Sequence, residues 1–169
     1  LDYDAVADVA VAPERAIFGY GNSGSDVSLT NLISTSGVVA ADVTGVGTAR
    51  DGLAAASYGG DKGIFGYGSS SGNVSLTNLV NNSGVVAADV TGVGTARFIL
   101  AACAYSTDKA IFGYGHAGGY VSMTNLVNNS GVVAADVSGV GTARAYVAAA
   151  KYGGDKGIFA YGDTGANTA

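Results

Sequence analysis

Few residues of this chain carry groups suited to acid–base, nucleophilic or metal chemistry. Its 169 residues include one histidine, His116, and one cysteine, Cys103. A site of the Ser-His-Asp kind needs a nucleophile and an orienting acid around the histidine, and no arrangement in the sequence indicates one. A zinc site needs several ligands, most of them histidine or cysteine. We therefore expect no catalytic residue, no metal site and no cofactor, and we interpret the chain as non-enzymatic.

Two glycine-rich runs match the phosphate-binding pattern G-x-G-x-x-G, at residues 19–24 and 113–118. That pattern binds a dinucleotide where a strand leads into a helix whose N-terminus meets the pyrophosphate. Here a short loop and a further β-type segment follow each run. The runs are therefore interpreted as turns and not as a nucleotide site.

A fixed period of 47 residues runs through the chain. Residues 37–50 and 84–97 are identical, and residues 131–144 differ from them only by Ser138 in place of threonine. An Ile-Phe-Gly-Tyr-Gly run recurs in the same phase, starting at Ile17, Ile64, Ile111 and, with Ala160 in place of its first glycine, Ile158. A period of this size indicates that one supersecondary unit is copied and that each copy completes the core of its neighbour.

The repeat gives Cys103 and His116 a structural interpretation. Alanine occupies the position of Cys103 in the units on either side, which predicts a small buried side chain; no basic neighbour in the sequence favours a reactive thiol. The equivalents of His116 are loop-type residues, namely Asn22, Ser69 and Asp163. A solvated loop histidine is therefore predicted, with contact to a ligand as the alternative.

Residues 97–143 show one unit, in which stretches of β-forming residues are bounded by glycine, asparagine or aspartate. We name the four β-type stretches segment A (98–105), segment B (110–114), segment C (120–127) and segment D (132–137). Helix fits badly, since the chain has 28 glycines and each interior glycine costs a helix about 1 kcal/mol. The prediction is an all-β fold of four-stranded antiparallel blades of a β-propeller, with a solenoid as the main alternative.

The unit also carries a recognisable order of residues after Arg97. Leu100, Ala101 and Ala102 follow, and after a turn residues 109–115 read Lys-Ala-Ile-Phe-Gly-Tyr-Gly. This order resembles the kelch repeat, which opens its first strand after an arginine and closes its second with a glycine doublet. Gly-Tyr-Gly replaces the doublet here, and the chain has no tryptophan. The unit is also similar to repeat arrays in predicted proteins of marine phages. The first resemblance implies a propeller, and the second implies a virion or extracellular surface.

Counted in this phase, the chain is a single array, 1–169, of about 3.5 repeats. The units are approximately 3–49 (unit 1), 50–96 (unit 2), 97–143 (unit 3) and the partial 144–169 (unit 4). Propellers usually need about four to eight blades. We therefore expect self-association or further repeats of a longer chain. The simplest closed form is a ring of two chains and about six blades, in which residues 145–162 of one chain replace the diverged residues 2–16 of another.

Charged residues of opposite sign recur once per unit. The arginines are Arg50, Arg97 and Arg144, and the aspartates are Asp42, Asp89 and Asp136. A structural pair of arginine and carboxylate accounts for this recurrence. The alternative is a ring of arginines facing an anionic ligand.

The copies differ most at two places, which are the two residues after each recurring arginine and the loop between segments B and C. In an up-and-down blade of four strands, the D–A and B–C connections emerge at the same end. Variation on one face is typical of loops that carry function, although drift at solvated tips gives the same pattern. The candidate ligand-binding residues are Asp51, Phe98, Ile99, His116, Tyr120, Ala145 and Tyr146.

Composition narrows the classes of function. The net charge of −5 and the absence of a basic cluster argue against nucleic acid as a partner. No apolar run reaches the ~18–20 residues of a membrane span. The sequence thus favours a structural or ligand-binding module that binds a glycan or a protein through one loop face. Two alternatives stay open: a polysaccharide-acting hydrolase or lyase with a site in the central pocket, and an engineered symmetric repeat scaffold.

Overall fold

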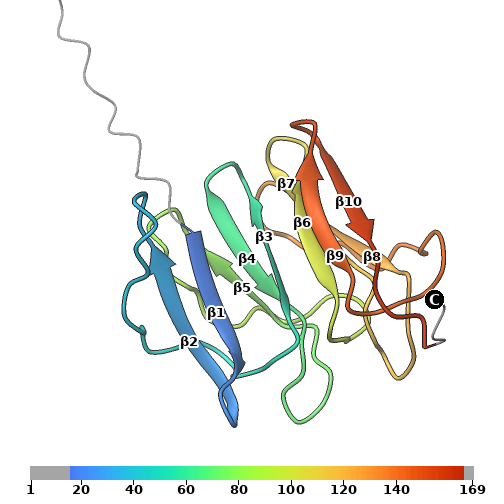
Figure 1. The fold of residues 1–169 in the computed structure, drawn as a ribbon, viewed down its shortest axis with the longest axis horizontal. Coiled ribbons are helices and arrows are strands. Elements are labelled where there is room, and N and C mark those ends of the chain that lie inside the picture. The colour runs from blue at the N-terminus through green and yellow to red at the C-terminus, as the bar shows by residue number, and fades with distance from the viewer. Residues whose placement is uncertain (1–15, 166–169) are drawn as a thin grey trace, which may run out of the picture.

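The structure, a computed structural model, describes residues 16–165 and folds them into antiparallel β-sheets without a helix (Figure 1). This confirms the all-β prediction. Expectations for residues 1–15 and 166–169, including Pro13, lie outside the described residues. The strands are β1 (Ala16–Asn22), β2 (Asp26–Ile33), β3 (Ala54–Tyr58), β4 (Lys62–Gly66), β5 (Thr77–Val80), β6 (Ala101–Tyr105), β7 (Lys109–Gly113), β8 (Thr124–Val127), β9 (Ala148–Tyr152) and β10 (Lys156–Ala160).

Segments A, B and C of one unit form one sheet. The order is β3-β4-β5 in unit 2 and β6-β7-β8 in unit 3, while β1-β2 and β9-β10 are two-stranded. The sequence explains the hairpin between segments A and B, because Gly59 and Gly60 both take positive φ angles, 61° and 84°. Within β3, Ala54 and Tyr58 are buried while Ala55 and Ser57 are exposed. This alternation turns the small apolar side chains of segment A toward the neighbouring unit.

Segment D is not a regular strand, so the prediction of four strands per unit was wrong for this segment. In unit 2 its valines make isolated antiparallel bridges, Thr77 with Val90 and Val80 with Val86. Between these bridges the amide of Asn78 donates to the carbonyl oxygen of Ala87 at 3.0 Å. A side chain thus takes a main-chain acceptor, which interrupts the ladder of strand hydrogen bonds. Unit 3 repeats the arrangement with Asn125 and Ala134.

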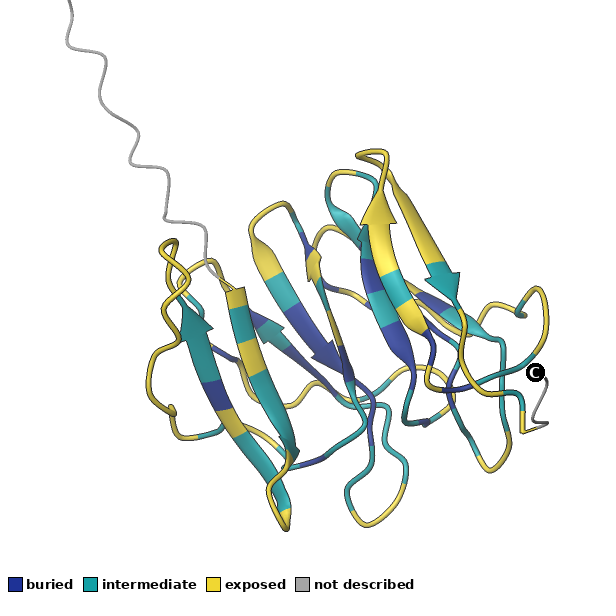
Figure 2. Cartoon of the chain, viewed as in Figure 1, coloured by how far each residue is buried: buried dark blue, intermediate teal, exposed yellow. Residues whose placement is uncertain are grey.

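Successive sheets follow one another along the long axis of the molecule in chain order (Figure 1). The segment A strands β3, β6 and β9 pack side by side from unit to unit. The two-stranded sheets β1-β2 and β9-β10 therefore lie at opposite ends of the described array. Buried residues concentrate in the sheets between them, whereas β9 and β10 are largely exposed (Figure 2).

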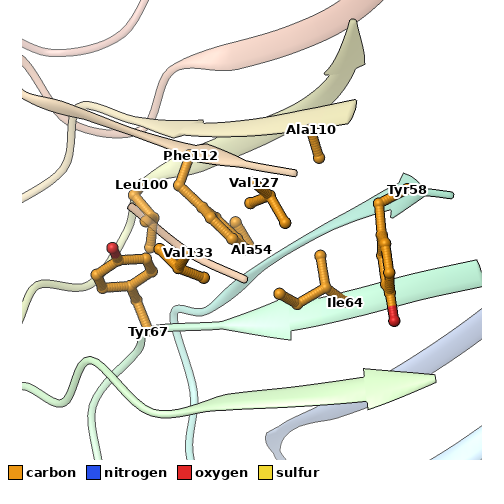
Figure 3. Packing of buried hydrophobic residues seen from close by; sticks show 9 residues of the cluster. All are labelled: Ala54, Tyr58, Ile64, Tyr67, Leu100, Ala110, Phe112, Val127 and Val133. Carbon is orange, nitrogen blue, oxygen red and sulfur yellow. The ribbon is translucent and has the colours of Figure 1, made fainter. Parts of the chain in front are cut away.

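The apolar core lies between units, as the repeat predicted. Ile64 and Tyr67 of unit 2 pack with Leu100 and Phe112 of unit 3 in the cluster drawn in Figure 3. A second cluster joins Phe65 of unit 2 to Ile17 and Tyr20 of unit 1, among others. Burial of these side chains stabilises the array only where two units meet.

One glycine per unit makes room for this packing. A Cβ added to Gly66 would lie 2.6 Å from Cζ of Phe112, and one added to Gly113 would lie 2.9 Å from Cζ of Phe159. The phenylalanine ring of each unit therefore occupies the space that a side chain would need in the unit before it. This close approach explains the first glycine of the Ile-Phe-Gly-Tyr-Gly run.

Candidate functional site: the loop face

The D–A and B–C connections of each unit lie together and are joined by main-chain hydrogen bonds. The amide of Phe98 donates to the carbonyl of His116 at 3.2 Å, and the amide of His116 donates to the carbonyl of Phe98 at 3.0 Å. Asp51 makes the same isolated bridge with Ser69, and Ala145 makes it with Asp163. We call this end of the molecule the loop face. It brings together the variable positions that the sequence marked as candidates, except that Ala145 is fully buried and offers no surface to a ligand, so its prediction as a binding residue was wrong.

Three rings from unit 3 form an aromatic cluster on the loop face. The His116 ring lies 5.5 Å from that of Phe98 and 5.5 Å from that of Tyr120, both measured between centroids and both edge to face. Such contacts are each worth about 0.5–1.5 kcal/mol beyond the burial of area. His116 is thus held between two rings and half-buried, so the prediction of a solvated loop histidine was wrong. Its Nδ1 atom is buried without a hydrogen-bond partner.

Tyr120 links the aromatic cluster to unit 4. Its hydroxyl donates to Oδ2 of Asp163 at 2.7 Å, and the amide of Gly165 donates to Oδ1 of the same carboxylate at 2.7 Å. The hydrogen bond raises the pKa of Tyr120, and the bonds from Tyr120 and Gly165 lower the pKa of Asp163. Asp163 is therefore an anionic, exposed acceptor beside the cluster. Unit 2 has an equivalent link, in which the Asn73 amide donates to the His116 carbonyl at 3.1 Å.

Tyr146 stands out from the loop face with 66% of its surface exposed. Its backbone is in the left-handed region with φ 53°, as is that of Ile99 with φ 48° and Gly52 with φ 57°. The amide of Ile99 donates to the Gly52 carbonyl at 2.7 Å, and the amide of Tyr146 donates to the Ile99 carbonyl at 3.0 Å. These bonds form a main-chain ladder across three units. They fix the backbone position of Tyr146, while its side chain remains largely exposed.

Two of the recurring arginines, Arg50 and Arg97, have a structural role. Arg50 and Arg97 are fully buried, which contradicts a ring of arginines facing an anionic ligand. Arg50 stacks on Tyr20 at 4.3 Å from the ring centroid, and its Nη1 lies 4.0 Å from Oδ1 of Asp89. Its Nη2 donates to Oδ1 of Asn78 at 2.7 Å. The predicted arginine–carboxylate pair is thus the outer part of a larger network.

Sequence reasoning missed two kinds of residue around these sites. The asparagines of segment C, Asn78 and Asn125, are fully buried and bind both the arginine and the aspartate. Their recurrence in each Thr-Asn-Leu run was the available signal. Asp163 appeared only as an equivalent of His116, and the sequence held no sign that Tyr120 would reach it from another unit.

Cys103 is buried, as its alanine equivalents predicted. Burial raises the pKa of its thiol, more than the backbone hydrogen bond from Ile158 lowers it. Within residues 16–165 no group of three or more histidine, cysteine, aspartate or glutamate residues is placed to hold a metal ion. The same residues contain no helix of the length and apolarity needed to cross a membrane.

Comparison with protein-family models and with curated proteins gave no match to this chain.

Proposed function

We propose that the chain is a non-enzymatic β-propeller module that binds a glycan through its loop face. The propeller part of the proposal is supported by sheets whose segment A strands pack against one another from unit to unit, and by the kelch-like order of residues. On this proposal each unit is one blade, and segment D is its irregular outer edge. A virion or extracellular surface is the proposed location.

The observation that carries the ligand proposal is the exposed Tyr146 ring beside the Tyr120–Asp163 pair. Tyrosine rings combine an apolar face with a polar tip, and the apolar face of a sugar ring packs against such a face. A carboxylate accepts strong hydrogen bonds from sugar hydroxyls. A rigid scaffold below variable loops is a common arrangement in binding proteins.

The test is a glycan array probed with the wild-type chain and with three variants. Tyr146→Ala removes the exposed ring, and Tyr120→Phe keeps the ring while removing the hydroxyl that donates to Asp163. Tyr152→Ala is the matched control, because Tyr152 is also an exposed tyrosine but lies at the A–B turn end of β9. We expect binding to be lost with Tyr146→Ala, weakened with Tyr120→Phe and unchanged with Tyr152→Ala.

Three results would contradict the proposal. Equal glycan binding by Tyr146→Ala and wild type would show that the glycan is not bound through the loop face. If the chain bound a protein on a protein array and no glycan on the glycan array, the ligand would be a protein and not a glycan. Turnover of a bound polysaccharide, abolished by changing one acidic residue, would replace the binding module with a hydrolase or lyase.

A further inference from the structure

Gly52, in the connection that opens unit 2, leaves no room for a side chain. A Cβ added there would lie 3.2 Å from Cδ2 and 3.3 Å from Cβ of Phe98 in unit 3. Both distances are shorter than the ordinary contact between carbon atoms, which lies at about 3.5–4.0 Å. The Phe98 side chain therefore occupies the space that a residue larger than glycine would need at position 52.

The same backbone arrangement recurs at the next boundary, between units 3 and 4. The amide of Ile99 donates to the Gly52 carbonyl at 2.7 Å, and the amide of Tyr146 donates to the Ile99 carbonyl at 3.0 Å. Ile99 has φ 48° and Gly52 has φ 57°, so the two residues hold the same conformation. By this equivalence the Cβ of Ile99 faces position 145, as a Cβ at position 52 would face Phe98. Position 145 holds alanine, and Ala145 is fully buried.

We propose that these two positions form a size-matched pair across each boundary, and that the match decides which unit can follow which. Gly52 accepts a following unit that carries Phe98, and Ile99 accepts one that carries Ala145. Two copies of unit 3 in succession would place Ile99 against Phe98, so that two large side chains would compete for one space. This inference does not depend on the glycan proposal.

The backbone of Ile99 supports the match. A β-branched residue at positive φ is strained, and such strain persists only where the surrounding structure holds it. At this boundary the small side chain of Ala145 leaves the space that the Ile99 side chain fills. The difference between glycine at position 52 and isoleucine at position 99 is therefore coupled to the residue across the boundary and is not free drift of a solvated loop.

The match at the first boundary also determines where one ring of the loop face stands. The Phe98 side chain packs over Gly52 of unit 2 and meets the His116 ring of its own unit edge to face, with 5.5 Å between the centroids. A larger residue at position 52 would displace Phe98 from this contact. Gly52 is thus a positioning residue for the aromatic cluster, although it lies in the preceding unit.

A double-mutant cycle followed by denaturant titration tests the pair at the first boundary. Gly52→Ile introduces the residue type that unit 3 carries at the equivalent position. Gly153→Ile is the matched control for backbone strain, because Gly153 has φ 58° and the nearest atom outside its chain neighbours lies 3.8 Å from an added Cβ. Gly52→Ile should raise the equilibrium constant of unfolding at least about tenfold more than Gly153→Ile, since overpacking adds to the strain. In a Phe98→Ala background this excess should disappear.

The second boundary is tested by the reciprocal change. Ala145→Phe should raise the equilibrium constant of unfolding at least about tenfold, because the Ile99 side chain stands where the new ring must go. In an Ile99→Gly background the ring gains the space that Phe98 has over Gly52. Most of the effect of Ala145→Phe should then be lost.

The NMR signals of His116, the only histidine of the chain, report the position of the Phe98 ring in an untagged protein. The two rings meet edge to face, so the ring current of Phe98 shifts the imidazole protons. Gly52→Ile should move the His116 signals toward their positions in Phe98→Ala. Gly153→Ile should leave them unchanged, which separates displacement of the ring from a general loss of stability.

An equal effect of Gly52→Ile on unfolding in wild type and in the Phe98→Ala background would overturn the proposal. An effect of Ala145→Phe that is the same with and without the Ile99 side chain would also overturn it. If Gly52→Ile does not fold, Gly52→Ala and Gly153→Ala take the same places in the cycle, and equal effects of these two variants would overturn the match. Unchanged His116 signals in a folded Gly52 variant would overturn the positioning role.

Discussion

The guanidinium of Arg97 lies 4.2 Å from the ring centroid of Tyr67, a residue of the preceding unit. On its other side Nη2 donates to Oδ1 of Asn125 at 2.7 Å within its own unit. One fully buried side chain therefore ties two units together, through a ring contact on one side and hydrogen bonds on the other. The planar fork of arginine suits this role, and the compact ammonium of lysine does not.

Arg97→Ala should lower the free energy of unfolding by about 1.5–3 kcal/mol, because the buried Asn125 acceptor loses its hydrogen bond from a charged donor. Arg97→Lys should rescue only part of that loss. Denaturant titration measures both effects. Lys151→Ala, at an exposed position of β9, is the control and should change stability by less than about 0.5 kcal/mol. If Arg97→Ala lowered the free energy of unfolding by less than about 1 kcal/mol, the size of one net hydrogen bond, the structural role would be contradicted.

Acid should destabilise the array through Asp89 and Asp136. Burial opposes ionisation of these carboxyls, but hydrogen bonds from Thr48 and Asn78 to Asp89, and from Thr95 and Asn125 to Asp136, together with the nearby arginine, lower the pKa of each below its ordinary value. A lowered pKa in the folded state stabilises the fold above the unfolded-state pKa of about 3.9, and that stabilisation is lost as pH falls through the folded value.

The free energy of unfolding is measured between about pH 2 and pH 7, a range that brackets the ordinary pKa of an aspartate carboxyl. Wild type should lose stability below about pH 4. The double variant Asp89→Asn, Asp136→Asn should be less stable at neutral pH and should show a shallower acid limb. Parallel curves for the two proteins would assign the acid sensitivity to other carboxyls.

Gly66→Ala should destabilise the contact between units 2 and 3 by about 1–3 kcal/mol, because the new methyl group meets the Phe112 ring. Gly72→Ala is the matched control, since a Cβ at Gly72 has no heavy atom within 4 Å. Thermal unfolding of the two variants compares them directly. A melting temperature for Gly66→Ala equal to that of Gly72→Ala would show that the ring moves aside without cost.

The Cys103 thiol should react slowly with a disulfide reagent in the folded protein, because it is buried and its pKa is raised. Denaturant should restore the ordinary rate, and the rate is read from the release of the coloured leaving group. Cys103→Ala should keep stability within about 1 kcal/mol, since Ala56 and Ala150 occupy the equivalent positions. Fast reaction without denaturant would indicate that this part of β6 opens readily.

The sequence predicted the β-class and the A–B hairpins, because turn residues such as Gly59 and Gly60 act locally. It predicted the core between units because the 47-residue repeat indicates that each unit packs on the next. Segment D could not be predicted as irregular. Its Val-Val-Ala-Ala-Asp-Val run has the composition of a strand, but the ladder is interrupted where the Asn78 side chain donates to the Ala87 carbonyl. Such competition depends on which side chains the fold brings together.

The same limit applies to the loop face. Grouping of the variable connections followed from the order of segments, and the main-chain bridges of Phe98 with His116 and of Ala145 with Asp163 show it. The bond from Tyr120 to Asp163 joins two units, so it depends on how neighbouring units are placed. No spacing within one unit carries that information.

The ladder from Gly52 through Ile99 to Tyr146 has a consequence for how this array can evolve. Its bonds use only amides and carbonyls, so the same ladder forms with a glycine, an isoleucine or a tyrosine in it. Side chains at these positions take no part in the bonds, although the left-handed backbone there, with φ between 48° and 57°, strains any residue other than glycine. Each unit can change its contribution to the loop face without breaking the ladder, while duplication of a whole unit carries the unchanged framework with it.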